Sequence, residues 1–250
     1  MLFHIVIPAR YGSTRLPGKP LLDIAGKPMV WWAWRQAASA GAKSVVVATD
    51  DPRIADVLME AGADVAMTSA DHPSGTDRLA EVARQRDWSD DSIVVNLQGD
   101  EPLMPVVNIQ QVAMELAQHE DASVATLCEP VDSIEQLHDP GVVKVVASAT
   151  GQALYFSRAA IPYQRDPEGE SSHVLLAAAR RHIGLYAYRC SFLKDFTGWP
   201  PAATEQLEAL EQLRALERGH LIRVVDAAES VPTGVDTPDD LERIRDLLGR

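Results

Sequence analysis

The sequence predicts an α/β fold, in which a doubly wound and mostly parallel sheet carries an inserted mixed α+β subdomain. Short apolar runs alternate with helical segments through the first half of the 250-residue chain. This alternation is typical of parallel strands joined by helical crossovers. From about residue 131 the strands follow one another more closely, which indicates an insertion. We expect one domain over residues 1–250, made of a first half (1–130), an inserted subdomain (131–225) and a return to the main sheet (226–250).

The first half contains five apolar runs that we expect to be strands, at 2–7, 44–49, 64–67, 92–97 and 122–127. Expected helices lie between them at 29–40, 52–61, 74–86 and 106–119. The second of these helices has the clearest start, because Asp51 can cap it and Pro52 suits its first position. The carboxyl ends of parallel strands meet at one edge of the sheet, so we expect ligands to bind at that edge.

The second half is predicted to hold strands at 142–147, 153–156, 181–188 and 222–225. A polar stretch at 165–172 matches no motif. Residues 205–218 predict a single helix, with Leu207, Leu210, Leu213 and Leu216 on one stripe. Thr237 and Pro238 begin a last helix.

Composition excludes several classes of protein. A hydrophobic content of 46% supports a full core, and the two cysteines form no metal-binding or redox spacing. No signal peptide and no membrane-spanning run is visible, so we expect a cytoplasmic protein with no membrane partner. The net charge of −13 argues against a nucleic-acid surface, which needs a broad basic face. This charge does not argue against a small anionic ligand held by a few local cations.

The loop after the first strand has the character of an anion-binding site. Arg10, Arg15 and Lys19 lie in it among glycines and prolines, and no acidic residue precedes Asp23. Glycine lets backbone N–H groups approach a phosphate, while arginine and lysine balance its charge. The alternative is a solvated basic turn. The absence of nearby acids and the position at a strand end favour phosphate.

Two common phosphate loops do not fit this segment. A P-loop needs G-x-x-x-x-G-K-[ST], but five residues separate Gly12 from Gly18, and Pro20 stands where the hydroxyl residue belongs. A dinucleotide fold needs the glycine triplet G-x-G-x-x-G, which is absent. A dehydrogenase on a similar sheet is therefore disfavoured.

The segment 8–20, PARYGSTRLPGKP, resembles the nucleotide-binding opening of the sugar nucleotidyltransferases, and most closely that of the 3-deoxy-manno-octulosonate (KDO) cytidylyltransferases. The resemblance covers almost the whole chain. It continues in VATD (47–50), MTSADH (67–72), SGTDRLAE (74–81), NLQGDEP (96–102), VKVV (143–146), ALYFSR (153–158), HIGLY (182–186) and GVDTP (234–238). Their common order along one chain makes a chance match untenable.

The resemblance implies a reaction between CTP and KDO that serves lipopolysaccharide synthesis. The sugar's anomeric 2-hydroxyl attacks the α-phosphorus, which gives CMP-KDO and pyrophosphate. Chemistry of this kind depends on positioning and charge neutralisation. The implied catalytic residues are Arg10, Lys19, Asp100 and Asp236, with Asp100 and Asp236 as ligands of Mg²⁺. No residue stands out as a general base.

The resemblance also divides the ligand-binding residues between the two halves. The nucleotide positions are Ala9, Arg10, Gly12, Ser13, Lys19, Ser74, Arg78 and Gln98. The sugar positions are Arg15, Gln98, Arg158, His182, Tyr186, Glu211 and Gln212. The first half is thus implied to bind the nucleotide, and the inserted subdomain to bind the sugar and to form a homodimer.

Each of these assignments has a structural alternative. Asp100 suits a turn and Asp236 a helix cap, while Arg78 could be a surface charge paired with Asp77 or Glu81. His182 could be a half-buried strand histidine, and a charged outer helix face would explain Glu211 and Gln212. We assign Asp77, Glu101 and Asp239 to structure or solvent. Two functional alternatives also remain: the same chemistry with another substrate (sialic acid, 8-amino KDO or methylerythritol phosphate), and a non-catalytic nucleotide-binding regulator.

Overall fold

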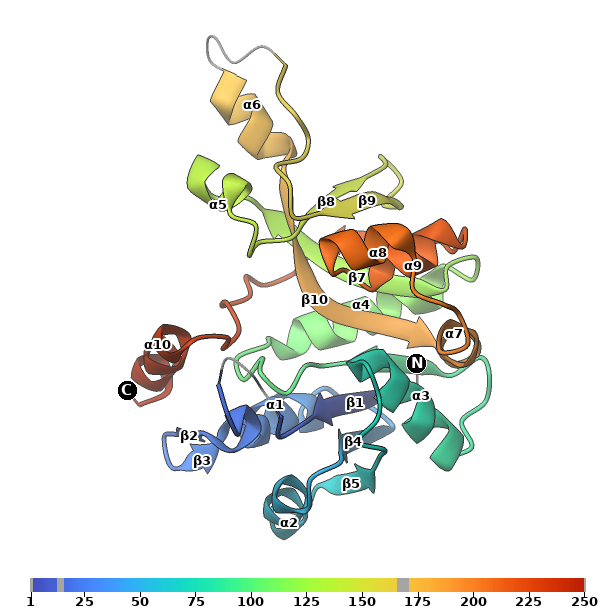
Figure 1. Cartoon of the computed structure of the whole chain (residues 1–250), viewed down its shortest axis with the longest axis vertical. Coiled ribbons are helices and arrows are strands. Elements are labelled where there is room, and N and C mark those ends of the chain that lie inside the picture. Colours follow the sequence, from blue (N-terminus) through green and yellow to red (C-terminus); the bar gives the residue numbers. More distant parts are fainter. Residues whose placement is uncertain (1, 13–15, 166–170, 250) are drawn as a thin grey trace.

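A computed structural model describes residues 2–12, 16–165 and 171–249 (Figure 1). Within these residues nine strands form one mixed sheet whose main path runs β11-β7-β10-β6-β1-β4-β5, with β8 and β9 attached beside β10. The strands are β1 (Phe3–Ala9), β4 (Ser44–Thr49), β5 (Asp64–Met67), β6 (Ile93–Asn96), β7 (Val124–Pro130), β8 (Lys144–Ala147), β9 (Ala153–Ser157), β10 (Arg180–Arg189) and β11 (Ile222–Asp226). A separate hairpin pairs β2 (Asp23–Ile24) with β3 (Lys27–Pro28).

The main path of the sheet is mostly parallel, as predicted, with one reversed strand in its middle, and β8 and β9 add antiparallel pairs beside β10. β1 pairs in parallel with β4 and β6, β4 with β5, and β11 with β7. β10 runs antiparallel between β6 and β7. From β1 the chain builds first toward β4 and β5 and then returns to the other side at β6. The carboxyl ends of β1 and β6 therefore flank the point where the strand order reverses, which is where α/β sheets bind ligands.

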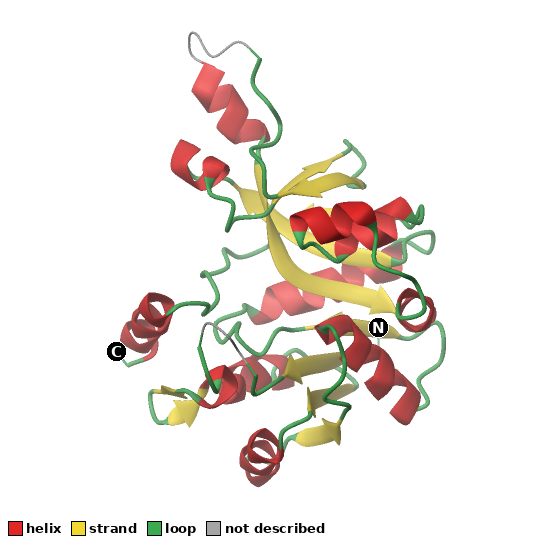
Figure 2. Ribbon diagram, viewed as in Figure 1, coloured by secondary structure: helices red, strands yellow, loops and turns green. Residues whose placement is uncertain are grey.

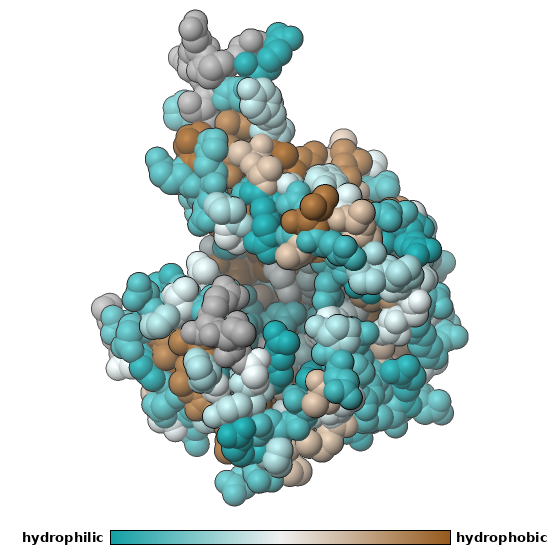
Figure 3. Space-filling view, in the orientation of Figure 1, coloured by the Kyte–Doolittle hydropathy of each residue, from teal (hydrophilic) through white to brown (hydrophobic). Residues whose placement is uncertain are grey.

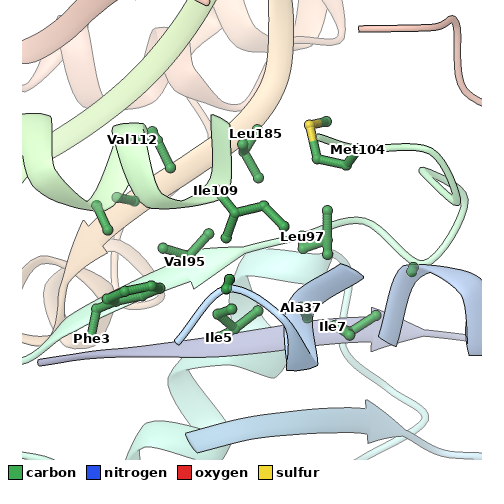
Figure 4. Close-up of a cluster of buried hydrophobic side chains, with 14 of the residues drawn as sticks. Phe3, Ile5, Ile7, Ala37, Val95, Leu97, Met104, Ile109, Val112 and Leu185 are labelled. Atoms are coloured by element: carbon green, nitrogen blue, oxygen red, sulfur yellow. The ribbon is translucent and has the colours of Figure 1, made fainter. Parts of the chain in front are cut away.

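Helices cover both faces of the sheet, as a doubly wound fold requires (Figure 2). One face packs against α1 (Met29–Ala38), α2 (Pro52–Glu60) and α4 (Val106–Gln118), and the other against α3 (Gly75–Gln85), α7 (Cys190–Phe196) and α9 (Gln212–Glu217). Side chains alternate along β1, so Ile5 and Ile7 enter the first core while Val6 enters the second. Figure 4 shows Ile5 and Ile7 packed with Ile109 of α4 in the first core.

Local capping explains several helix starts that the sequence predicted. The Asp51 carboxylate accepts from the Arg53 backbone N–H over 2.9 Å, and Pro52 begins α2. Ser74 caps α3. Thr237 and Pro238 begin α10 (Pro238–Leu248), where Thr237 and Asp240 exchange hydrogen bonds. These starts were readable from sequence because each depends on residues that are close along the chain.

The predicted single helix at 205–218 is wrong. The chain forms α8 (Ala203–Glu208), turns through Ala209 at a φ of 51°, and then forms α9. Leu207 is 87% exposed, so the leucines do not share one buried stripe. Across this break, Arg214 Nε donates to the carboxylate of the buried Glu205 over 2.8 Å. A turn at residues 209–212, with this ion pair across it, therefore takes the place of the predicted continuous helix.

Three further helices were not predicted: α5 (Ile134–His138), α6 (Ser171–Ala178) and α7. The first two rise with β8 and β9 from the main body in Figure 1, whereas β10 and β11 belong to the main sheet. The predicted subdivision at residues 131 and 225 stays a prediction. Most of the polar stretch at 165–172 lies outside the described residues. No helix in the described part of the chain is both long and apolar enough to span a bilayer.

Candidate active site

A cavity of about 480 Å³ opens at the carboxyl ends of β1 and β6. Figure 3 shows the surface hollowed between the lower body and the part that rises above it. The cavity is lined from seven segments: the end of β1 and the residues after it, Lys19 with Pro20, the start of α3 and the residues before it, the end of β6 and the turn after it, one side of β10, the 209–212 turn, and Asp236. Residues from both halves of the chain therefore share one cavity.

Lys19 joins two carboxylates that are far apart in the sequence. Its Nζ lies 2.6 Å from Asp100 Oδ2 and 2.9 Å from Asp236 Oδ1. Lys19 is only 9% exposed, and it follows Gly18, whose φ of 66° favours glycine. Burial alone would lower the pKa of Lys19, but the charges and hydrogen bonds of Asp100 and Asp236 outweigh this and raise the pKa. The lysine is therefore held in its cationic form.

The same two carboxylates fit a magnesium ion. Mg²⁺ is commonly held by one or two carboxylates, with substrate phosphate and water completing the shell. Asp100 and Asp236 converge on one cation, the Lys19 ammonium, and both keep exposed side-chain surface. No group of three or more His, Cys, Asp or Glu in the described residues gathers as a metal cage. The donor set thus suits an ion that arrives with a phosphate ligand.

The turn that carries Asp100 contacts the loop that carries Asp236. The Val235 N–H donates to the Asp100 carbonyl oxygen over 3.0 Å. A Cβ on Gly234 would lie 2.6 Å from Glu101 Oε1, so the glycine lets the two loops approach closely. Burial, followed by the charge of Asp100, raises the pKa of Glu101 to about 8. Sequence reasoning left Glu101 to structure or solvent and did not find this contact, because nothing local indicates that the two loops meet.

On the nucleotide side, Ala9, Arg10, Gly12, Lys19, Ser74, Arg78 and Gln98 all line the cavity. Ser13 lies outside the described residues. The Ser74 hydroxyl donates to Asp77 Oδ2 over 2.7 Å, which fixes it at the start of α3. A Cβ on Gly99 would lie 3.2 Å from the Pro8 carbonyl oxygen, so a glycine lets the turn after β6 lie against the end of β1.

Arg78 is not the surface charge that we considered as an alternative. It is 4% exposed, its Nη2 lies 2.9 Å from Asp50 Oδ1, and its Nη1 donates to Thr68 Oγ1 over 2.6 Å. The Asp50 contact is close enough for an ion pair but too poorly aligned to count as a hydrogen bond. The sequence did not indicate that Asp50 and Thr68 are partners of Arg78, although both lie within the motifs that carry the resemblance.

On the sugar side, Gln98, Tyr186, Glu211 and Gln212 line the cavity, whereas Arg158 and His182 do not. Arg15 lies outside the described residues. Glu211 faces the site instead of an outer helix face: Thr76 Oγ1 donates to its Oε2 over 2.9 Å. Burial raises the pKa of Glu211, against the opposing effect of the hydrogen bond from Thr76. Thr76 and Tyr188, which sequence reasoning did not select, also line the cavity.

Arg158 and His182 lie outside this cavity lining for different reasons. Arg158 Nε donates to the Glu208 carbonyl oxygen over 2.7 Å, and its Nη1 donates to that of Pro140 over 2.9 Å, so its guanidinium binds the main chain. His182 packs beside Tyr186, with ring centroids 5.3 Å apart. Burial lowers the pKa of His182 to about 3, so its imidazole is neutral.

Comparison with known proteins assigns the class. The sequence profile of the cytidylyltransferase family matches residues 4–223, and a solved cytidylyltransferase from Leptospira borgpetersenii, 16% identical, shares the fold at a TM-score of 0.62 over 98% of this chain and 86% of that one. The chain is a nucleotidyltransferase of the cytidylyltransferase family.

Nearer relatives specify the family further. A 3-deoxy-manno-octulosonate cytidylyltransferase of Pseudomonas fluorescens is 56% identical over 98% of both chains, and one of Photobacterium profundum is 52% identical over 100% of both. A solved CMP:2-keto-3-deoxy-manno-octonic acid synthetase complexed with CTP is 43% identical, with a TM-score of 0.90 over 100% of this chain and 99% of that one. The chain belongs to the 3-deoxy-manno-octulosonate cytidylyltransferases, as the motifs predicted.

Proposed function

We propose that this enzyme transfers CMP from CTP to the anomeric 2-hydroxyl of KDO and releases pyrophosphate, which supplies CMP-KDO for lipopolysaccharide synthesis. The observation that carries the proposal is the meeting of Lys19, Asp100 and Asp236 at one edge of the cavity. It is supported by a relative of that name at 56% identity over nearly the full length.

In the proposed reaction the sugar's 2-hydroxyl oxygen forms a bond to the α-phosphorus of CTP. The bond between that phosphorus and the oxygen bridging to the β-phosphorus breaks, pyrophosphate leaves, and the hydroxyl proton is released. Arg10 and Lys19 balance the charge on the phosphates, since both line the cavity beside the end of β1. Lys19 acts as a fixed point charge because its two carboxylate partners hold it in place.

We also propose that the reaction requires Mg²⁺ held by Asp100 and Asp236. A bound magnesium ion would supply charge neutralisation at the phosphates and make the attacking hydroxyl more acidic. Asp100 lies at the turn after β6, and Asp236 lies just before α10. Together they would place the ion next to Lys19, between the nucleotide and sugar sides of the cavity.

The two substrates are assigned to opposite sides of the cavity. Ser74, Arg78 and Gln98 would surround the nucleotide, because they line the cavity from the start of α3 and the turn after β6. Tyr186, Glu211 and Gln212 offer hydroxyl, carboxylate and amide groups for the hydroxyls of a sugar acid. Arg15 and Ser13 remain assigned through the resemblance alone, and Arg158 and His182 lie outside the observed cavity lining.

A substrate panel tests the proposal. The protein is incubated with Mg²⁺, each nucleoside triphosphate in turn and a set of sugar acids, and pyrophosphate release is measured. We expect release with CTP and KDO. Release only with sialic acid, 8-amino KDO or another acceptor would retain the reaction class and reject KDO. No release with any pair would favour a nucleotide-binding regulator.

The metal assignment is tested with Asp100→Asn and Asp236→Asn against the control Asp239→Asn. Asp239 is exposed and lies three residues from Asp236. We expect the first two variants to need much more Mg²⁺ for activity and to lose the Mg²⁺-dependent rise in melting temperature in the presence of CTP. Near-normal turnover of Asp100→Asn at ordinary Mg²⁺ would contradict the assignment.

A homodimer formed through the second half is a further part of the proposal. Large apolar side chains are exposed there, at Leu154 (58%), Tyr163 (85%) and Val174 (71%). We expect a dimer in sedimentation that Tyr163→Glu combined with Val174→Glu weakens, whereas Leu247→Glu on α10 does not. A monomeric parent protein would contradict the proposed homodimer.

We also propose a cytoplasmic location, which the buried free thiols of Cys128 and Cys190 support.

A further inference from the structure

The strand β10 contains a bulge between the two aromatic residues of the proposed sugar side. Ile183 pairs with Leu127 of β7, but the next pair along is Tyr186 with Thr126, so Gly184 and Leu185 have no partner there. The two extra residues keep His182 and Tyr186 on one face, because an even insertion preserves the alternation of side chains. In a regular strand, the Cα atoms of two residues four positions apart lie about 13 Å apart. The ring centroids of His182 and Tyr186 are only 5.3 Å apart, which is consistent with a strand that bends at the bulge.

Thr126 lies opposite this bulge and is completely buried. Its Oγ1 lies 3.0 Å from the Ile183 carbonyl oxygen, 2.9 Å from the Leu185 carbonyl oxygen and 2.9 Å from His182 Nε2. One hydroxyl thus contacts both carbonyls of the bulge and the imidazole beside it. No role in the proposed reaction has been given to Thr126, and it does not line the cavity.

The three contacts of Thr126 decide which nitrogen of His182 carries the proton. A threonine hydroxyl has one proton to donate and lone pairs that accept. Carbonyl oxygens can only accept, so the hydroxyl proton must be directed to the carbonyls of Ile183 and Leu185. If it pointed to His182, two buried carbonyls would face a hydroxyl oxygen at hydrogen-bond distance without a proton between them. The remaining contact is therefore donated by His182 Nε2–H.

The rest of the imidazole environment agrees with a neutral ring. Phe156 packs edge-on against His182 with centroids 5.0 Å apart, and burial holds the pKa of His182 well below its usual range. A neutral imidazole with its proton on Nε2 has a lone pair on Nδ1. In the described residues Nδ1 has no hydrogen-bond partner, and His182 keeps part of its surface exposed. Nδ1 is thus available as an acceptor.

We infer that Thr126 is a positioning residue for the sugar side of the cavity: it closes the bulge of β10, which places Tyr186 at the cavity, and it fixes the neighbouring His182 as the Nε2–H tautomer. This inference rests on the proposed function, since it takes the ligand beside Tyr186 to be a sugar acid.

The tautomer is measured first, by ¹⁵N NMR of the histidine-labelled protein without ligands, with the His182 signals identified by their loss in His182→Gln. We expect Nε2 of His182 to be protonated and Nδ1 to be unprotonated at neutral pH. A proton on Nδ1, or on both nitrogens, would overturn the inference. This measurement needs no substrate and no altered Thr126, so it holds even if the proposed function fails.

Kinetics test the consequence for the substrate. Thr126→Val keeps the side-chain shape and removes the hydroxyl, Thr126→Ser keeps the hydroxyl, and Thr197→Val is the matched control at a threonine outside the cavity lining. We expect Thr126→Val to raise the KM for KDO about tenfold, the size of one neutral hydrogen bond, and to leave the KM for CTP within about twofold. Thr126→Ser should restore the KDO value. Equal changes in both KM values, or none, would overturn the positioning role.

Failure of the proposed function and failure of the Thr126 inference would give different results. If wild-type protein releases no pyrophosphate with KDO but does so with another sugar acid, the proposed substrate is wrong, and the same variants are measured with that acid. If the wild type uses KDO and Thr126→Val uses it equally well, the proposed function stands and the inference falls.

Discussion

The Lys19 ammonium donates to Oδ1 of Asp236 over 2.9 Å, although 217 positions of sequence separate the two residues. The same ammonium donates to Asp100, which belongs to the turn after β6. One cation therefore joins the segment after the first strand, the turn after β6 and the segment before the last helix at a single point. In the proposed reaction this point lies beside the triphosphate, so substrate phosphates and metal would enter an already assembled cluster of charges.

Replacing Lys19 should affect turnover far more than folding. Lys19→Met keeps much of the side-chain length and removes the charge that we assign to the phosphates. We expect kcat to fall by at least about 100-fold, as when one electrostatic donor is removed from an active site. The melting temperature should change little, because Asp100 and Asp236 retain 38% and 52% side-chain exposure and water can solvate them. Lys27→Met, at an exposed lysine, should retain activity, and unchanged kcat in Lys19→Met would contradict the assignment.

Glu101 predicts a specific dependence of stability on pH. Its folded pKa of about 8 lies above the ordinary 4.5, so the fold favours the protonated carboxyl. The resulting stabilisation is complete below about pH 4.5, declines as the pH rises, and is lost above about pH 8. At about 1.4 kcal/mol per pH unit, it falls by up to about 4 kcal/mol between pH 5 and pH 8.

The neutral isostere Glu101→Gln should remove this dependence. The free energy of unfolding, measured by urea denaturation of both proteins across that range, should fall more steeply with pH in the wild type. Parallel curves would mean that Glu101 is ionised in the folded protein at neutral pH.

A side chain at Gly234 is predicted to disturb the contact between the loops that carry Asp100 and Asp236. In Gly234→Ala the new Cβ would lie 2.6 Å from Glu101 Oε1 and 3.2 Å from the Asp100 carbonyl oxygen, so the Glu101 side chain or the loop that carries Asp236 must move. We expect a loss of turnover of about tenfold or more, since small displacements in a catalytic cluster are costly. Gly198→Ala is the matched control, because its nearest contact would be an ordinary 3.4 Å. If a crystal structure of Gly234→Ala left Asp236 in place with normal kcat, the loop contact would have no catalytic consequence.

The Arg78–Asp50 pair is predicted to stabilise the nucleotide side of the cavity. Arg78→Met leaves Asp50 without its cation in a mostly buried position, and breaking such a pair costs about 3–5 kcal/mol when burial is complete. We expect about 2–3 kcal/mol here, because Asp50 keeps 22% side-chain exposure. Arg84→Met on the exposed side of α3 should cost little. A double-mutant cycle with Asp50→Asn measures the coupling, and additive losses would show that the pair is not coupled.

Much of the first half of the fold could be predicted because its signals are local. β1, β4, β5 and β6 are short apolar runs, and Asp51 and Ser74 cap the helices that they precede. A buried parallel strand and a helix cap each depend on a few adjacent residues, which a sequence pattern contains. The second half was predicted less well: the leucine stripe at 205–218 indicated one helix, but the buried pair of Glu205 and Arg214 accompanies a break at Ala209.

By itself, the sequence determined the alternation of strands and helices, the cationic loop at the first strand end, and the motifs that place the chain in its family. Only the tertiary structure decided that Lys19 lies between Asp100 and Asp236, that Glu101 lies against Gly234, and that Thr126 closes the bulge beside His182. The physical reason is range. Propensity, caps and periodicity act over a few residues, whereas pKa shifts, tautomers and shared cations depend on groups that meet only when the sheet has formed.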